Sequence, residues 1–171
     1  HGAAYIQDER SYSFNEVGEL SCRIANALLA TGLPKETKGA VWALNDTTAW
    51  TCALGLWRAN MCWLPVGARN SADENQLVLD RFDCELLFFQ QAFAPTIAAL
   101  QDRLPKVRHW ICLDGAAPEV RGAVALQAWV TVIDLGLSYT LNLEMARYSA
   151  GQTAPDELRG LLGAVQWLYA G

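Results

Sequence analysis

Two pairs of adjacent carboxylates, five cysteines and two histidines are the side chains of this sequence that could do chemistry. The carboxylate pairs are Asp8-Glu9 and Asp73-Glu74. Two neighbouring acids can divide the acid and base roles of a catalytic step. One pair falls in a polar turn, and the other falls in the first turn of an expected helix, where the helix dipole favours acids. We therefore expect both pairs to be solvated rather than catalytic.

The cysteines are odd in number and include no CxxC pair: they are Cys22, Cys52, Cys62, Cys84 and Cys112. Each falls inside an expected helix or strand. Metal and redox sites usually show closely spaced cysteines, and disulfides are rare in reducing compartments. We therefore expect five buried, unpaired thiols and no metal ligand among them.

The two histidines, His1 and His109, do not supply a site either. His1 could belong to a tag remnant. His109 lies inside the apolar stretch 107–113, where a half-buried side chain is more common than a ligand or a base. No catalytic, cofactor-binding or metal-binding residue is assigned from these residue types and spacings.

The composition narrows the class of protein. The chain has 171 residues, of which 52% are hydrophobic and 18% charged, and its net charge is −5. It has no run of Lys and Arg, so nothing favours nucleic acid or an anionic membrane as a partner. No apolar run reaches the roughly 20 residues that cross a bilayer, and the N-terminus lacks a basic segment followed by an apolar one. A cytoplasmic protein without a transmembrane segment is expected.

The element around which the chain is organised is a strand, helix and strand over residues 39–66. Asp46 or Thr47 is expected to cap the helix, and Asn60 is expected to end it in a left-handed conformation. Because the helix is apolar in nearly every direction, we expect it to lie between other layers. Residues 61–66 read as a second buried strand, so the unit predicts a parallel sheet.

The remaining segments continue the alternation of strand and helix. Ser13 and Glu16 form a capping-box pattern before a helix over 14–31, and Ser71 is expected to cap a helix whose inner face holds Leu77, Val78 and Phe82. The other expected strands are two short ones within 4–13 and one each at 84–89 and 107–113. A helix is expected at 93–104, a helix or a strand at 123–133, and an amphipathic helix at 156–169. Residues 135–147 show no clean period. The fold class is α/β, a doubly wound, mostly parallel sheet with helices on both faces.

Four segments in this order resemble the shared motifs of the adenylate-forming enzymes: acyl-CoA synthetases, adenylation domains of peptide synthetases, and luciferases. The segments are Tyr12–Val17, Asn45-Asp46, Leu56–Val66, and Arg69–Asn75 together with the strand Cys84–Phe88. The last of these resembles the acyl-CoA synthetase branch more than the peptide-synthetase branch. The resemblance covers residues 4–114, and residues 115–171 match poorly.

This resemblance implies an ATP-dependent acyl-CoA synthetase, which converts a carboxylic or fatty acid, ATP and CoA into acyl-CoA, AMP and pyrophosphate through an acyl-adenylate, with Mg²⁺ on the phosphates. In that family the chemistry is done by a Gly-rich phosphate loop ending in lysine, an aromatic-Gly-x-Thr-Glu segment, a ribose-binding aspartate and a later lysine. None of these occurs in the 171 residues. We therefore expect residues 1–171 to be one incomplete N-terminal domain that binds no cofactor, is inactive alone and can self-associate through exposed apolar surface.

Three other classes of protein share part of this pattern. Asp46 and Asp114 follow expected strands as in a receiver-type signalling domain, but no lysine occurs after Lys106. A dinucleotide-binding domain would need GxGxxG after its first strand, which is absent. A degenerate, non-catalytic α/β interaction module stays open. Trp50, Trp57 and Trp63 could line an acyl pocket, but packing in the core is the expected role.

Overall fold

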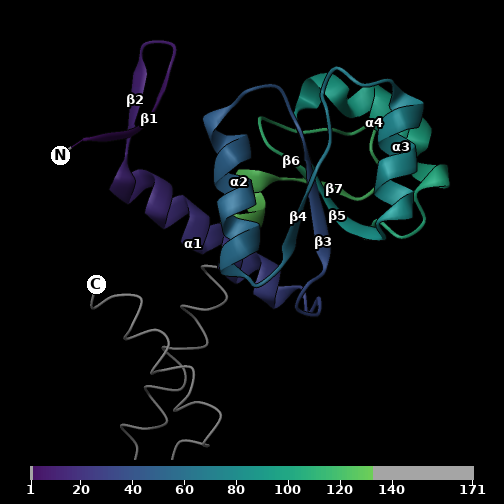
Figure 1. Ribbon diagram of the computed structural model, residues 1–171, viewed down its shortest axis with the longest axis horizontal. Helices are drawn as coiled ribbons and strands as arrows, with labels where there is room; N and C mark the ends of the chain where they lie inside the picture. Colours follow the sequence, from purple (N-terminus) through teal and green to yellow (C-terminus); the bar gives the residue numbers. More distant parts are fainter. Residues whose placement is uncertain (1, 133–171) are drawn as a thin grey trace, which may run out of the picture. The chain divides into compact units, whose positions relative to one another are not determined.

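The computed structural model of the protein describes residues 2–132. Its main sheet has five parallel strands in the order β4-β3-β5-β6-β7 (Figure 1). The strands are β3 (Lys38–Trp42), β4 (Cys62–Pro65), β5 (Cys84–Phe89), β6 (His109–Cys112) and β7 (Ala123–Ala125). The predicted parallel arrangement of the first four strands is confirmed.

Helices cover both faces of this sheet (Figure 1). One face packs against α1 (Phe14–Ala30) and α2 (Thr47–Arg58), and the other packs against α3 (Ala72–Arg81) and α4 (Ala94–Leu100). Successive residues of β5 point to opposite faces of the sheet, since Phe88 belongs to the apolar cluster on the first face and Phe89 to the cluster on the second. A strand buried on both faces needs the nearly continuous apolar sequence seen here. The doubly wound α/β prediction is therefore confirmed.

The helix starts follow from local sequence. Ser13 accepts a hydrogen bond from the Glu16 backbone N–H, and the Glu16 carboxylate accepts from the Ser13 N–H, which completes the predicted capping box. Ser71 and Glu74 repeat this pattern before α3. Asp46, one of the two predicted caps of α2, accepts from the Ala49 N–H. These side chains satisfy donors that have no partner inside the first helical turn.

An antiparallel hairpin precedes α1. It consists of β1 (Ala3–Gln7) and β2 (Arg10–Ser13), as predicted for residues 4–13. Asp8 takes a left-handed conformation with φ of 54° in the turn. The last residue of β2, Ser13, is also the N-cap of α1, so the hairpin continues into the helix without a linker.

The position of β4 differs from the prediction of a buried strand. β4 lies at the edge of the sheet, Cys62 and Pro65 are exposed, and Trp63 is only half-buried. The cause is the connection after β4, which returns past β3 to place β5 on its other side. β3 thereby becomes the inner strand. The helix before β4 is also less enclosed than predicted, since Trp50 and Trp57 of α2 are 41% and 46% exposed.

The inner face of α3 also differs from the prediction. Leu77 and Phe82 are 59% and 51% exposed, whereas Asn75 and Leu79 are fully buried. Asn75 and Leu79 are four residues apart and therefore share one side of the helix. Asn75 donates a hydrogen bond from Nδ2 to the carbonyl oxygen of Gly67 at 2.8 Å, which is compatible with burial of this polar side chain beside Leu79.

The later segments are shorter than predicted. The helix expected over 93–104 is α4 flanked by two 3-10 turns, Gln91–Phe93 and Gln101–Arg103. The ambiguous segment 123–133 contains both structures, because β7 is followed directly by helical residues 126–132. The segments 135–147 and 156–169 lie outside the described residues.

Candidate functional site at the carboxyl edge of the sheet

The centre of the sheet contains a topological switch point. The chain leaves β3 through α2 on one face and leaves the neighbouring β5 through α4 on the other face. In open α/β sheets, ligands bind beside such a point, at the carboxyl ends of the strands. Here the ends of the two strands are joined, since Leu44 donates its backbone N–H to Gln90 Oε1 at 2.8 Å.

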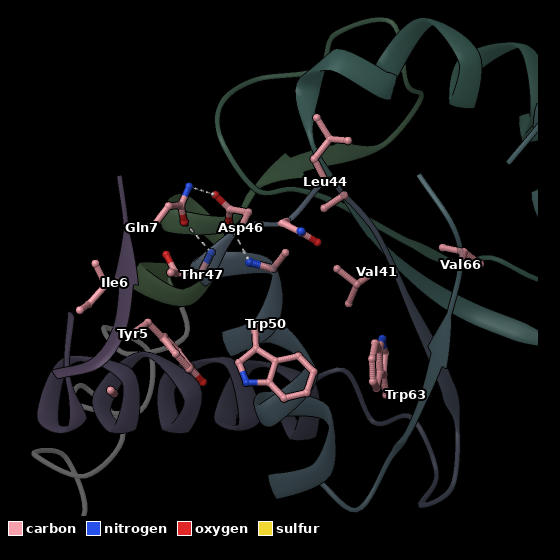
Figure 2. Close-up of a pocket in the computed structure, with 14 residues that line it drawn as sticks. Tyr5, Ile6, Gln7, Val41, Leu44, Asp46, Thr47, Trp50, Trp63 and Val66 are labelled. Carbon is pink, nitrogen blue, oxygen red and sulfur yellow. Dashed lines mark hydrogen bonds between the residues drawn. The ribbon is translucent and has the colours of Figure 1, made fainter. Parts of the chain in front are cut away.

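A groove of about 710 Å³ opens beside this edge (Figure 2). Its walls come from β1, the carboxyl end of β3, the first turn of α2, and β4. Three aromatic side chains, Tyr5, Trp50 and Trp63, give it a largely apolar surface. Its volume lies within the range of small-molecule sites, roughly 300–1,000 Å³.

The N-terminus of α2 lies in this groove, and two of its first backbone N–H groups already have acceptors within the protein. Ala49 donates its N–H to Asp46 Oδ1 at 3.0 Å, and Thr47 donates its N–H to Gln7 Oε1 at 2.8 Å. Gln7 Nε2 in turn donates to Asp46 Oδ2 at 3.3 Å (Figure 2). A helix N-terminus binds phosphate through such free N–H groups. With these donors occupied and a carboxylate as its one charged lining residue, the described groove does not fit a triphosphate.

The three tryptophans predicted to pack in the core instead form a cluster at the sheet edge. The ring centroids of Trp50, Trp57 and Trp63 are 5.5–5.8 Å apart, and each pair meets nearly edge to face. Such pairs contribute about 0.5–1.5 kcal/mol beyond burial of area. Trp50 and Trp63 line the groove, and Trp57 does not. The prediction of a core role is therefore wrong for the two exposed rings, Trp50 and Trp57.

Tyr5 connects the hairpin with this cluster. Burial raises the pKa of the Tyr5 phenol, and a hydrogen bond with the Trp50 side chain acts in the opposite direction. The phenol therefore stays protonated at neutral pH and serves as a neutral hydrogen-bonding group.

The adjacent carboxylates form no catalytic dyad. Asp8 and Glu9 are exposed in the hairpin turn. Asp73 pairs with Arg103 at 2.7 Å, and Glu74 accepts from the backbone and hydroxyl of Ser71, which lower its pKa. All four side chains are accounted for by solvent, an ion pair or a helix cap.

The contacts of Asp114 and His109 are those of side chains that belong to the fold. Asp114 Oδ1 accepts the N–H of Gln91 at 2.7 Å and so ties the end of β6 to that of β5. His109 is half-buried, and desolvation together with the positive charge of Arg108 lowers its pKa. Within residues 2–132, no three His, Cys, Asp or Glu side chains are close enough to hold a metal ion, and no helix could cross a membrane.

Two glutamines that the sequence did not single out hold this edge together. Gln7 joins the hairpin to α2, and Gln90 joins β5 to β3. Their partners lie about forty residues away in the sequence. No local pattern marks them, because glutamine has no spacing rule comparable to a capping box.

Comparisons with known proteins give a family match, a curated relative and solved structures of similar fold. Residues 2–149 match the family described as AMP-binding enzyme. Tyrocidine synthase 3 of Brevibacillus parabrevis is 27% identical over 170 residues, a match that covers 96% of this chain and 2% of that protein. The anthranilate CoA ligase AuaEII, crystallised with anthranoyl-AMP, superposes with a TM-score of 0.67 and 18% identity over 75% of this chain and 24% of the ligase. The inhibitor-bound N-terminal domain of FACL13 from Mycobacterium tuberculosis gives a TM-score of 0.58 and 23% identity over 68% of this chain and 30% of that chain.

The chain therefore belongs to the AMP-binding enzyme family. Its parallel sheet and flanking helices have the fold of the N-terminal domain of adenylate-forming enzymes. It spans 2% of the length of the curated relative and less than a third of each of the two solved chains.

Proposed function

We propose that this chain forms part of an ATP-dependent acyl-CoA synthetase that activates a carboxylic or fatty acid. Such an enzyme joins the acid to AMP with release of pyrophosphate, and then passes the acyl group to CoA. The family match over residues 2–149 is the observation that supports an adenylate-forming reaction.

The segment Arg69–Asn75 supports the acyl-CoA branch. Its motif residues determine the local structure, since Asn70 Nδ2 donates to Asn75 Oδ1 at 3.2 Å and the buried Asn75 donates to the Gly67 carbonyl oxygen. Two solved relatives, one named as a CoA ligase, share the fold. The match to Tyrocidine synthase 3 supports a second candidate, the peptide-synthetase branch.

The absence of a nucleotide site from residues 2–132 is part of this proposal. The sequence has no Gly-rich loop followed by lysine, and Asp46 and Gln7 accept from two of the N-terminal N–H groups of α2. Adenylation requires the carboxylate to be held in line with the α-phosphate while donors and cations take up developing charge. We therefore propose that the 171-residue chain supplies scaffold, with ATP, Mg²⁺ and CoA used by the full enzyme, and has no activity alone.

Exchange of labelled pyrophosphate into ATP tests this proposal. The 171-residue chain should give no exchange above a control without protein, with any member of a panel of short- to long-chain acids. The complete reading frame that encodes the chain should give acid-dependent exchange, and CoA should then be consumed as AMP forms. Exchange by the 171 residues alone would reveal a nucleotide site within them and contradict the scaffold role.

The same assay separates the candidate branches. Exchange that depends on an amino acid, without consumption of CoA, would favour the peptide-synthetase branch. A complete reading frame that folds yet shows no exchange with either class of acid would support the non-catalytic interaction module. Circular dichroism of the same preparation provides the control for folding.

A further inference from the structure

The hairpin β1–β2 is held to the body of the protein with little apolar burial. None of the described residues 3–13 is buried, and the two apolar core clusters include none of them. Segments with few buried apolar contacts open at a lower free energy than the core does. The hairpin therefore depends on specific polar contacts for its position.

Gln7 provides two of these contacts. Its side-chain oxygen accepts from the Thr47 N–H at 2.8 Å, and its nitrogen donates to Asp46 Oδ2 at 3.3 Å. Figure 2 shows the Gln7 amide turned toward the start of α2 from β1. A single side chain thus holds the end of β1 against the first turn of a helix that starts forty residues later.

The same strand forms one wall of the groove. Ala4, Tyr5, Ile6 and Gln7 of β1 line it, facing α2, β3 and β4. Tyr5 adds a hydrogen bond with the Trp50 side chain. Movement of β1 would consequently remove one side of the groove and uncover Trp50.

The covalent connection of the hairpin is placed so that it can act as a hinge. β2 continues into α1 at Ser13-Phe14, where the capping box fixes the start of the helix. Phe14 is 69% exposed, so no apolar packing of its ring holds this junction to the body. A rotation about this junction would move the hairpin and leave α1 in place.

We propose that the hairpin β1–β2 is a strap along one wall of the groove, closed by the Gln7 hydrogen bonds to Asp46 and Thr47 and opened by their release. The strap opens as a unit while the sheet and its helices remain folded. This proposal rests on the geometry of residues 2–132 and is independent of the enzyme activity proposed above.

Hydrogen exchange followed by mass spectrometry on the 171-residue chain tests it. Gln7→Ala and the length-matched Gln7→Met both remove the two hydrogen bonds. Each should raise exchange in peptides covering residues 3–13 and 47–50 on the order of tenfold, because a lost hydrogen bond changes an opening equilibrium by about that factor. Peptides from β5 and β6 should exchange as in the unmodified protein.

A matched control is Gln76→Ala. Gln76 accepts from Arg103 Nη2 at 2.8 Å and donates to the Arg103 carbonyl oxygen at 3.3 Å, away from the hairpin. Its removal should leave hairpin exchange unchanged. The strap is refuted if the Gln7 variants leave hairpin exchange unchanged, if they raise exchange equally in β5 and β6, or if the hairpin of the unmodified protein has no protection.

Discussion

Gly55 of α2 lies directly against Ile24 of α1. A Cβ atom placed on Gly55 would be 2.4 Å from Ile24 Cγ2 and 2.8 Å from Ile24 Cβ, both closer than real contacts allow. The two helices approach each other this closely because one of them has no side chain at the crossing. We predict that Gly55→Ala destabilises the protein by about 1–3 kcal/mol, the usual cost of overpacking.

The matched control for this substitution is Gly18→Ala in α1. No atom lies within 4 Å of a Cβ placed on Gly18, so the change adds helix propensity without a clash. It should stabilise the protein by about 0.5–1 kcal/mol. Urea unfolding followed by circular dichroism measures both effects, and equal behaviour of the two variants would contradict the close helix contact.

Asn75 offers a second prediction, because it is a fully buried polar side chain. Asn75→Ala removes its hydrogen bonds with Gly67 and Asn70, so the Asn70 side-chain amide loses this partner and the Gly67 carbonyl keeps only the N–H of Asn70. Loss of a buried hydrogen-bond partner costs about 1–3 kcal/mol. Thermal or urea unfolding should show this loss, while Leu77→Ala on the exposed side of α3 should change stability by less than about 0.5 kcal/mol.

The five cysteines are free thiols with unequal exposure. Cys62 is exposed on the edge strand, whereas Cys52, Cys84 and Cys112 are buried. Burial raises the pKa of the Cys84 thiol to about 11, so it stays protonated at pH 8. A thiol reagent should therefore label one cysteine quickly in the native protein and five after denaturation.

Cys62→Ser should abolish the fast phase, which gives the control for that assignment. Fewer than five thiols after denaturation, without prior oxidation, would count against a reducing compartment. The buried thiols also predict alkaline instability. The pKa of Cys84 is raised from its usual 9.0, so the unfolded chain loses this proton first and stability falls as pH rises from about 9 toward 11. Cys84→Ala should reduce that slope.

Trp50 and Trp57 lead to a prediction about association. Both rings are more than two-fifths exposed and lie together beside an edge strand that lacks charged residues. Exposed apolar patches and unprotected edges favour contact with other chains. We expect light scattering to show self-association at high concentration and an apolar dye to bind.

Trp57→Ser should reduce both signals. Phe82→Ser is the control, since Phe82 is similarly exposed but lies at the C-cap of α3, in no aromatic contact among those described. A strict monomer without dye binding would contradict the prediction.

Sequence predicted those parts of the fold that depend on neighbouring residues. The capping boxes at Ser13 and Ser71 involve a residue and another three positions later, so their chemistry is visible in the sequence. The apolar run of β5 likewise predicted a strand buried on both faces. Because strands and helices alternate along the chain, few topologies other than a parallel sheet are possible.

The errors concern relations between distant segments. An apolar strand does not reveal whether it has one neighbour or two, so β4 was expected to be buried. The side of α3 that faces inward holds Leu79 together with Asn75, whose bond to Gly67 lies outside the helix and is not visible in the helical pattern. The wall of the groove at β1 is held by Gln7 and Asp46, whose pairing exists only once the hairpin has folded against α2.

The central place of β3 also bears on how the chain folds during synthesis. β3 pairs with β4 on one side and β5 on the other, and both partners come later in the sequence. On the ribosome, which adds about 5–20 residues per second, the inner strand therefore emerges before either of its neighbours. The side of β3 that pairs with β5 has no partner until Phe89 has left the exit tunnel, so this interval is when a chaperone has an open strand edge to shield.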